Sequence, residues 1–425
     1  MSSILTNNGA MVALQTLKTI NSRLAETQQE ISTGKSVATA KDNSAVWAIS
    51  KVMEADVKGF QAISDSLNLG QSTVAVARQA AETVSELLTD IKGKIVSAQE
   101  ENVDREKIQA DISALRDQIS AVVGAAQFNG LNLLSNVSLT IGSGEINILS
   151  SLDRSGDGVS ASDITVRKQD LSFQEQVLGT TAVATLADYV TGTPAAITGA
   201  DTSAARTLTF MGGVVEAGIG YQVTLSTPVG NASVGDGGGD FSPSAGVYEY
   251  VARDGDTAQD VATELAKLIN NGQADTVTAS VNSANAAGDT GLEFSFTDST
   301  DGVTFAFAAY QSTDAVVGGG LSQLANIDVT SQDGADSALL AVEGLIDVAI
   351  DAGAAFGSGQ GRIETQLDFV SGLTDALKSG IGTLVDADME EASARLQAIQ
   401  VQQQLGVQAL SIANQAPQSL LSLFQ

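Results

Sequence analysis

The residue types that most often perform catalysis are missing from this sequence. It contains no histidine and no cysteine, which excludes an imidazole base, a thiolate nucleophile and a zinc site of the usual nitrogen and sulfur type. Carboxylate pairs such as Glu390 and Glu391 are acid–base candidates by type alone. They lie within amphipathic helical patterns, where a solvated helix face is the better interpretation. We therefore expect no catalytic residue, no cofactor and no enzymatic activity.

One segment has the spacing of a metal-binding loop. Asp153, Ser155 and Asp157 stand at positions one, three and five of a calcium loop, with Gly158 at position six. The full motif requires a glutamate at position twelve, where this chain has Ile164. An Asp/Gly turn is therefore the favoured interpretation, and the three oxygen ligands are only a weak metal-site candidate.

The charge of the chain excludes several classes of partner. With 21 basic and 50 acidic residues, the net charge is −29, whereas nucleic-acid binding needs clustered lysine and arginine. An anionic membrane surface is disfavoured for the same reason. No stretch reaches the ~18 uninterrupted apolar residues of a membrane span, and the first residues lack the pattern of a cleaved signal peptide. We expect neither a nucleic acid nor a membrane as partner.

Both ends of the chain carry the a/d pattern of a coiled coil, with apolar residues at alternating steps of three and four. The N-terminal stripe consists of Ala10, Ala13, Leu17, Ile20, Leu24 and Ile31, with polar Thr27 in phase. The C-terminal stripe consists of Val385, Met389, Ala392, Leu396, Ile399, Leu410, Ala413, Leu420 and Phe424, with the polar or helix-breaking residues Gln403, Gly406 and Pro417 in phase. A stripe this narrow is not buried by one helix alone, so we expect the two ends to pack on each other.

Further helices are expected next to these stripes. Apolar periodicity predicts helices over 49–98, 108–126 and 363–384, and Thr33–Gly34 predicts the end of the first helix. The glycine-rich run 357–361 is interpreted as a loop that links two helices.

The middle of the chain, roughly 141–330, has a different character. Between Lys168 and Arg362 the only basic residues are Arg206, Arg253 and Lys267. Apolar residues alternate with polar ones over 207–210, 221–226, 247–252, 276–281, 292–297 and 303–307, which predicts strands, and a short helix is expected over 257–269. The expected fold is mainly α, with an inserted α+β or β-rich domain at the far end of a long antiparallel coiled coil formed by both chain ends.

The pattern alone leaves two architectures open. If one molecule does not satisfy its stripes, neighbouring copies must cover them, and repeated contacts that do not close produce a helical filament. The alternative is an ordinary coiled-coil bundle that carries a β domain.

Short motifs at both ends resemble those of bacterial flagellins, and most closely those of alphaproteobacteria. At the N-terminal end they are Leu-Ala-Glu-Thr-Gln-Gln-Glu-Ile-Ser-Thr-Gly at 24–34, Ala-Lys-Asp-Asn-Ser-Ala-Val-Trp-Ala-Ile at 40–49, Asp-Arg-Glu-Lys-Ile-Gln at 104–109 and Phe-Asn-Gly-Leu-Asn-Leu-Leu at 128–134. At the C-terminal end they are Leu-Val-Asp-Ala-Asp-Met at 384–389, Gln-Gln-Gln-Leu-Gly at 402–406 and Ala-Leu-Ser-Ile-Ala-Asn-Gln at 409–415. The resemblance covers about 1–140 and 335–425, and does not reach the middle.

This resemblance implies a structural subunit that polymerises into the hollow helical flagellar filament for swimming motility. Residues 1–40 with 385–425 would form the inner tube, 41–140 with 335–384 a surrounding helical layer with a small β-hairpin near 131–150, and 141–334 a variable outer domain. The self-assembly seam would comprise Leu17, Ile20, Leu24, Ile31, Leu396, Ile399, Leu410, Ala413, Leu420 and Phe424.

The resemblance also implies a location and a set of partners. The chain would be exported unfolded through the flagellar type III apparatus to the extracellular filament. Its partners would be other copies of itself in a homopolymer, an export chaperone, the filament cap and the hook–filament junction proteins. The alternatives are a hook–filament junction protein with the same helical ends, and an adhesive binding module that uses the middle domain.

One family motif is altered here. Many flagellins carry Q-R-x-R-E-L-x-V on the long helix, in the segment that contacts the mammalian Toll-like flagellin receptor. In this chain Asp90 replaces an arginine, Gly93 a glutamate and Lys94 a leucine. Reversing a charge and removing an apolar anchor weakens an interface centre, so we expect weak or no activation of that receptor.

Overall fold

The computed structural model describes residues 7–155, 158–183, 186, 189–191, 206–211, 215–226, 246–273, 277–282, 288–296, 304–311 and 314–421. They fall into two compact units. The terminal unit comprises Met1–Asp65, Arg154–Val159 and Leu367–Gln425, and the central unit comprises Ser66–Asp153 and Ser160–Gln366. Each unit is described separately. No helix among the described residues has the length and apolar character that crossing a membrane requires.

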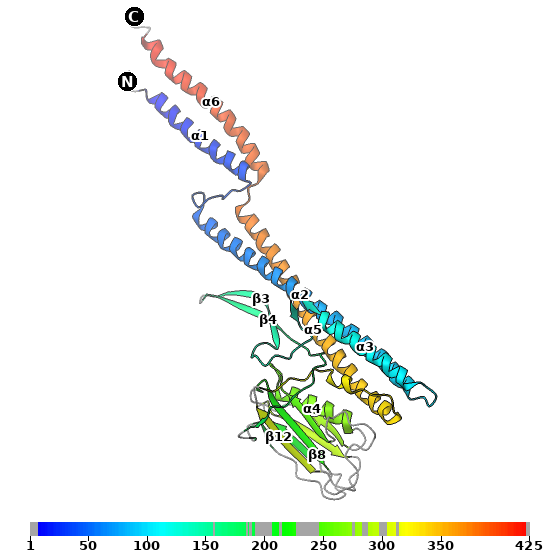
Figure 1. The fold of residues 1–425 in the computed structure, drawn as a ribbon. Coiled ribbons are helices and arrows are strands. Elements are labelled where there is room, and N and C mark those ends of the chain that lie inside the picture. Colours follow the sequence, from blue (N-terminus) through cyan, green and yellow to red (C-terminus); the bar gives the residue numbers. More distant parts are fainter. Residues whose placement is uncertain are drawn as a thin grey trace. The chain divides into compact units, whose positions relative to one another are not determined.

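The terminal unit is built on two antiparallel helices, α1 (Asn8–Thr33) and α6 (Met389–Leu421), which run side by side (Figure 1). Asn7 caps the start of α1 by accepting a hydrogen bond from the Ala10 N–H at 3.0 Å. The helix ends at Gly34, whose φ of 70° is the left-handed conformation that glycine adopts without strain. The predicted end of the first helix at Thr33–Gly34 is therefore confirmed.

Two long helices, α2 (Ser44–Ala98) and α5 (Gln332–Val385), continue from one unit into the other. Within the central unit they pack antiparallel, and α3 (Arg105–Ala125) is the third long helix of that unit. Four polar pairs show the direction of α2 and α5: Gln99–Gln332, Lys92–Glu343, Arg78–Gln360 and Gln71–Glu364. Their shared core includes the fully buried side chains of Leu88, Ile91, Ile95, Ile112, Ile119 and Phe356.

The expected loop at 357–361 is wrong, because this run lies inside α5. Each glycine in a helix costs about 1 kcal/mol relative to alanine. The side chains of Phe356 and Ile363, on either side of the run, are completely buried and keep it in the packed helix. Tertiary packing overrides the local preference of these glycines.

Two β-ribbons follow α3. The first is a tight hairpin of β1 (Gln127–Phe128) and β2 (Leu131–Asn132), whose turn residues Asn129 and Gly130 have φ values of 51° and 80°. Positive φ at both turn positions matches the twist of the flanking strands. The second ribbon pairs β3 (Glu145–Ser155) with β4 (Gly158–Arg167). The small hairpin expected near 131–150 therefore lies earlier, and a longer ribbon begins within that range.

The remaining central elements form a β domain, which we define as strands β5–β12 with helix α4 (Ala258–Gln273). One antiparallel sheet has the order β10-β11-β7-β6 and the other the order β5-β12-β8-β9. The bounds are β5 (Thr181–Ala182), β6 (Val190–Thr191), β7 (Arg206–Phe210), β8 (Ile219–Ser226), β9 (Val247–Val251), β10 (Val277–Val281), β11 (Thr290–Phe296) and β12 (Thr304–Gln311). The six predicted strands and the helix are confirmed, although 276, 297 and 303 lie outside the described residues.

The β domain has its own hydrophobic core. Phe210 packs edge to face on Tyr221 and on Phe307, with ring centroids 5.8 and 6.0 Å apart. From α4, Val261 and Leu265 are completely buried in the same cluster. The short helix η2 (Ser322–Asn326) then returns the chain to α5.

Candidate self-assembly seam and junction cluster

The predicted N-terminal stripe lies on one face of α1. Thr27 is buried, and the other positions of the series, Ala10, Ala13, Leu17, Ile20, Leu24 and Ile31, are half-buried. Most residues between them are exposed. The helix therefore presents one continuous stripe to α6.

The C-terminal stripe behaves in the same way. Ala392 and Ile399 are buried, and the half-buried positions are Leu396, Gln403, Gly406, Leu410 and Ala413. Met389 is the exception at 43% exposure, since it stands at the first position of α6. Phe424 and the side chain of Leu420 lie outside the described residues.

The polar and glycine positions within the stripe have partners of their own. Gln403 donates a hydrogen bond to the Asn21 side chain at 2.8 Å. A β-carbon at Gly406 would stand 3.1 Å from Leu17 Cδ1 and 3.6 Å from Ile20 Cδ1. Glycine at this position therefore lets the two helices approach closely.

The connection that follows α1 and the connection that precedes α6 are hydrogen-bonded to each other. The Ser36 N–H donates to the Val385 carbonyl at 2.7 Å, and the Ala387 N–H donates to the Gly34 carbonyl at 3.0 Å. Within the first connection, hydrogen bonds from Thr39 and Ala38 lower the pKa of Asp42. These bonds hold the inner ends of α1 and α6 at one place.

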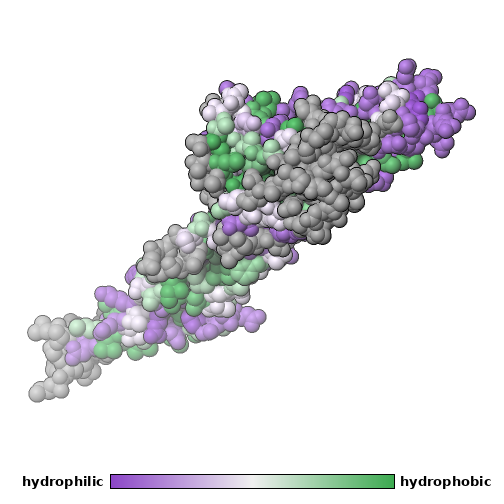
Figure 2. Space-filling model, turned by 90° about the horizontal axis from the view of Figure 1, so that it is seen from below, coloured by the Kyte–Doolittle hydropathy of each residue, from purple (hydrophilic) through white to green (hydrophobic). Residues whose placement is uncertain are grey.

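A second apolar face lies on α6, away from the stripe. Val401, Leu405 and Ile412 are 55, 58 and 68% exposed, and steps of four and seven place them on one side of the helix. Met11 and Val12 are exposed on α1. Figure 2 shows hydrophobic and hydrophilic residues next to each other on the terminal helices, at the faint end of the view. The a/d template missed these residues because it accounts for one stripe per helix.

The altered receptor segment lies on α2. Asp90 and Gly93 are exposed, and Lys94 is half-buried. The Lys94 ammonium lies 2.6 Å from the Asp111 carboxylate on α3, and Lys92 pairs with Glu343 on α5 at 2.5 Å. Lys94 is therefore held by a contact within the central unit.

The weak calcium candidate is only partly described. The backbone from Asp153 to Ser155 continues strand β3, while Asp157 and the side chains of all three candidate ligands lie outside the described residues. Across the described part of the chain, no group of three or more carboxylates is placed to hold a metal ion.

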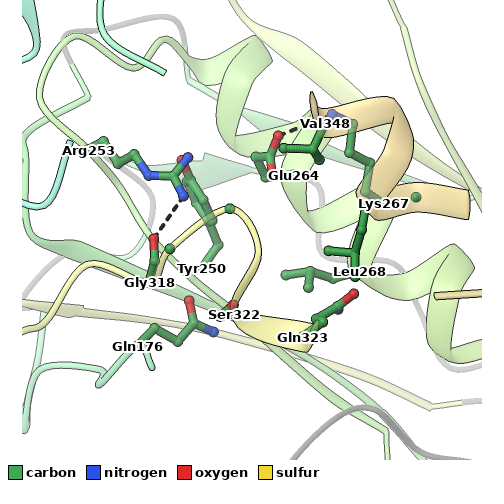
Figure 3. A pocket seen from close by; sticks show the side chains of 14 residues that line it. Gln176, Tyr250, Arg253, Glu264, Lys267, Leu268, Gly318, Ser322, Gln323 and Val348 are labelled. Carbon is green, nitrogen blue, oxygen red and sulfur yellow. Dashed lines mark hydrogen bonds and ion pairs between the residues drawn. The ribbon is translucent and has the colours of Figure 1, made fainter. Parts of the chain in front are cut away.

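A buried polar cluster lies where the β domain meets the segments that enter and leave it (Figure 3). Arg253 Nη2 donates to the Gly318 carbonyl at 2.8 Å, and its Nε lies 3.7 Å from Asp170 Oδ2. The Asp170 side chain is completely buried. The guanidinium also covers the Tyr250 ring, 5.6 Å from the centroid. Arg253 thus links the turn after β9 to the segment that enters the β domain, at Asp170, and to the segment that leaves it, at Gly318.

Asp256 completes this cluster. Its Oδ2 accepts hydrogen bonds from the Tyr250 hydroxyl at 2.6 Å and the Arg253 N–H at 2.7 Å. Burial raises the pKa of Asp256 and that of Tyr250. The adjoining cavity of 60 Å³ has room for a few water molecules, well below the roughly 300 Å³ of a small ligand pocket. The cluster is therefore a structural junction.

Comparison with known proteins identifies the family. The family description "Bacterial flagellin N-terminal helical region" matches residues 4–138, and "Bacterial flagellin C-terminal helical region" matches residues 339–424. Flagellin A of Rhizobium meliloti is 34% identical over 438 residues, and Flagellin B of Rhizobium meliloti strain 1021 is 36% identical over 429 residues. Both alignments cover 100% of this chain and 100% of the relative.

Among solved structures, FliC from Burkholderia pseudomallei matches with a TM-score of 0.30 and 14% sequence identity, covering 69% of this chain and 99% of that one. The two family regions fall on the helices that carry the terminal stripes and the helical layer. The chain belongs to the bacterial flagellin family.

Proposed function

We propose that this flagellin polymerises through α1 and α6 into the hollow helical filament. In the proposal, residues 1–40 with 385–425 form the inner tube, and 41–140 with 335–384 form the surrounding layer. Residues 141–334 form the outer variable domain. The proposal assigns the self-assembly role to the stripe from Leu17 to Ile31 and to its partner stripe on α6.

The second apolar face of α6 is the observation that carries this proposal. The face made by Val401, Leu405 and Ile412 is exposed although the opposite face is already packed on α1. Burial of apolar surface contributes about 25 cal/mol per Å², so covering this face favours association. Other copies of the same helices supply the cover, and a contact between unlike faces that does not close extends into a filament.

Membership of the family supports a proposal for export and partners. The chain would leave the cell unfolded through the flagellar type III apparatus with an export chaperone, and would meet the hook–filament junction proteins and the filament cap at the growing structure. The absence of cysteine is compatible with this route, since no disulfide has to be reduced before passage. The assembled filament would be extracellular.

Activation of the Toll-like flagellin receptor should be weak or absent. Asp90 and Gly93 stand on the exposed surface of α2 where the family motif has arginine and glutamate. A triple variant, Asp90→Arg, Gly93→Glu and Lys94→Leu, should raise the response of reporter cells to purified monomer. Full activation by the unchanged chain would contradict this expectation.

A hook–filament junction protein is the second candidate, because it would share the helical ends. The relatives that align over the full chain are named flagellins, which favours the filament subunit. The adhesive module would require binding of a glycan or a host surface by the middle domain.

The exposed face supplies a direct test. Val401→Asp with Leu405→Asp leaves the α1–α6 stripe unchanged and places two charges on the second apolar face, so the variant should fail to form filaments in a sedimentation and electron-microscopy assay. The control, Gln402→Asp with Gln404→Asp, adds the same charge to exposed polar positions of the same helix and should polymerise. Equal filament yields from the two variants would exclude this face as the contact.

A further inference from the structure

In the part of the chain that the structure describes, the two sheets of the β domain have four edge strands. An edge strand presents unpaired N–H and C=O groups, and a strand of another chain can form hydrogen bonds to them. A very short edge strand offers few such groups and so limits this pairing. Two of the edges, β5 and β6, are two residues long. The other two, β9 and β10, are five residues long, which leaves a full strand of outward backbone groups on each.

The pairing pattern shows which groups of β10 point outward. The Asn282 N–H donates to the Gly291 carbonyl at 2.8 Å. Because bonded and non-bonded pairs alternate in an antiparallel ladder, Ser280 and Thr278 also bond to β11. Ala279, which stands opposite Phe294, directs its N–H and C=O away from β11 at the centre of the edge.

Asn270 on α4 closes this position. Its Oδ1 accepts a hydrogen bond from the Ala279 N–H at 2.6 Å, and its Nδ2 donates to the Ala279 carbonyl at 2.9 Å. A residue of an added strand would make this same pair of bonds. Asn270 is held in place because its neighbour on α4, Ile269, is completely buried in the core.

A side-chain amide also meets the long edge of the other sheet. The Leu225 N–H donates to the Gly246 carbonyl and the Ala252 N–H to the Ile219 carbonyl, so the alternation directs the backbone of Glu249 away from β8. Gln176 Nε2 donates to the Glu249 carbonyl at 2.5 Å. Both long edges are thus met by an amide from outside the sheet.

We propose that Asn270, with Gln176 as its counterpart, prevents the β domains of two copies from pairing edge to edge. The need for this closure rests on the proposed function, because a filament holds many copies at fixed close spacing. The closure itself is a property of the single chain. Its loss at β10 therefore produces association of this protein with a second copy of itself.

Asn270→Ala in the full chain tests the proposal. Sedimentation velocity over a concentration series should show concentration-dependent association that the unchanged protein lacks. Hydrogen exchange at the Ala279 amide should become about tenfold faster or more, as expected for one lost hydrogen bond. Asn282→Ala is the matched control, because the Asn282 side chain bonds to Glu293 Oε2 and leaves the outward groups of β10 unchanged.

A second variant separates an open edge from a damaged fold. Ala279→Pro removes the outward N–H at no cost to the β10–β11 ladder, since proline is tolerated at an edge position that donates no ladder bond. Asn270→Ala with Ala279→Pro should return to the monomeric behaviour of the unchanged chain. The proposal would be overturned if the double variant associated as strongly as Asn270→Ala alone. It would also be overturned if Asn270→Ala stayed monomeric although its Ala279 amide exchanged quickly.

These measurements are made on unassembled protein. A failure of the unchanged chain to form filaments would count against the proposed function and leave the edge result standing.

Discussion

The paired terminal helices and the β domain differ in how far each is complete in a single molecule. Most of the stripe between α1 and α6 is only half-buried, and the opposite face of α6 exposes large apolar side chains. The β domain instead buries Phe210, Phe294 and most of α4's apolar face almost completely. The β domain thus leaves little apolar surface for a partner, whereas contiguous exposed apolar surface of the kind on α6 marks an interaction site.

The charges of the two regions differ in the same sense. At the terminal pair, Arg395 lies 3.6 Å from Glu30 and both side chains keep contact with solvent, so the pair contributes little to stability. In the β domain, Arg253 lies beside the completely buried Asp170. Removing one partner of a buried pair is strongly destabilising. Charge substitutions should therefore act mainly on assembly in the first region and on folding in the second.

The largest effect is expected from a substitution that breaks the β domain alone. Phe294→Ala removes a completely buried ring and should cost about 3–5 kcal/mol, which lowers the temperature of the β-domain transition in calorimetry. Filament yield should stay unchanged. Phe369→Ala is the control, because this phenylalanine is 60% exposed in the terminal unit and its loss should leave the β-domain transition where it was. Loss of filaments with Phe294→Ala would show that the two regions depend on each other.

A smaller effect is expected where the terminal helices approach most closely. Gly406→Leu forces a side chain into the space next to Leu17 and Ile20, and overpacking of this kind costs about 1–3 kcal/mol. The critical concentration for polymerisation should rise. Gly93→Leu adds the same side chain to a helix position with no atom within 4 Å, and should polymerise normally. Equal critical concentrations for the two variants would mean that the close approach is not needed for assembly.

The smallest effect concerns pH. Burial raises the pKa of Asp256 above its ordinary value of 3.8, so the folded β domain binds a proton at a pH where the unfolded chain does not. The contribution of this group to stability is therefore fully present below pH 3.8 and is lost as the pH rises through the raised pKa. Asp256→Asn should reduce the resulting slope, measured as the β-domain transition temperature in a pH series that begins at 3.8 and runs upward. An unchanged slope would assign the pH dependence to other carboxylates.

Periodic patterns made the helical frame predictable from the sequence. The helix end at Gly34 and the turn at Asn129–Gly130 follow from local conformation, and the stripe from Ala10 to Ile31 follows from its three–four spacing. These features depend on residues close together in the chain. The assembly role of the stripe stays a prediction.

The features that sequence reasoning missed depend on contacts made only in three dimensions. The run 357–361 lies in α5 between Phe356 and Ile363, whose complete burial keeps the segment helical. Arg253 pairs with Asp170, which is 83 positions away in the sequence. The local sequence around Arg253 gives no sign of this partner. Asn270 caps an edge whose outward positions are known only from the register of β10 and β11. The second apolar face of α6 carried a sequence signal, the four and seven steps of Val401, Leu405 and Ile412, that a search for one stripe per helix overlooks.

Seeded polymerisation tests the central claim most directly. The purified chain would be dissociated by heat, mixed with short filament fragments, and examined by negative-stain electron microscopy beside a variant that lacks residues 390–425. Long tubular filaments from the full chain and none from the truncated variant are the predicted result. A full chain that stays monomeric under seeding, or a truncated variant that polymerises equally well, would contradict the assignment of assembly to the terminal helices.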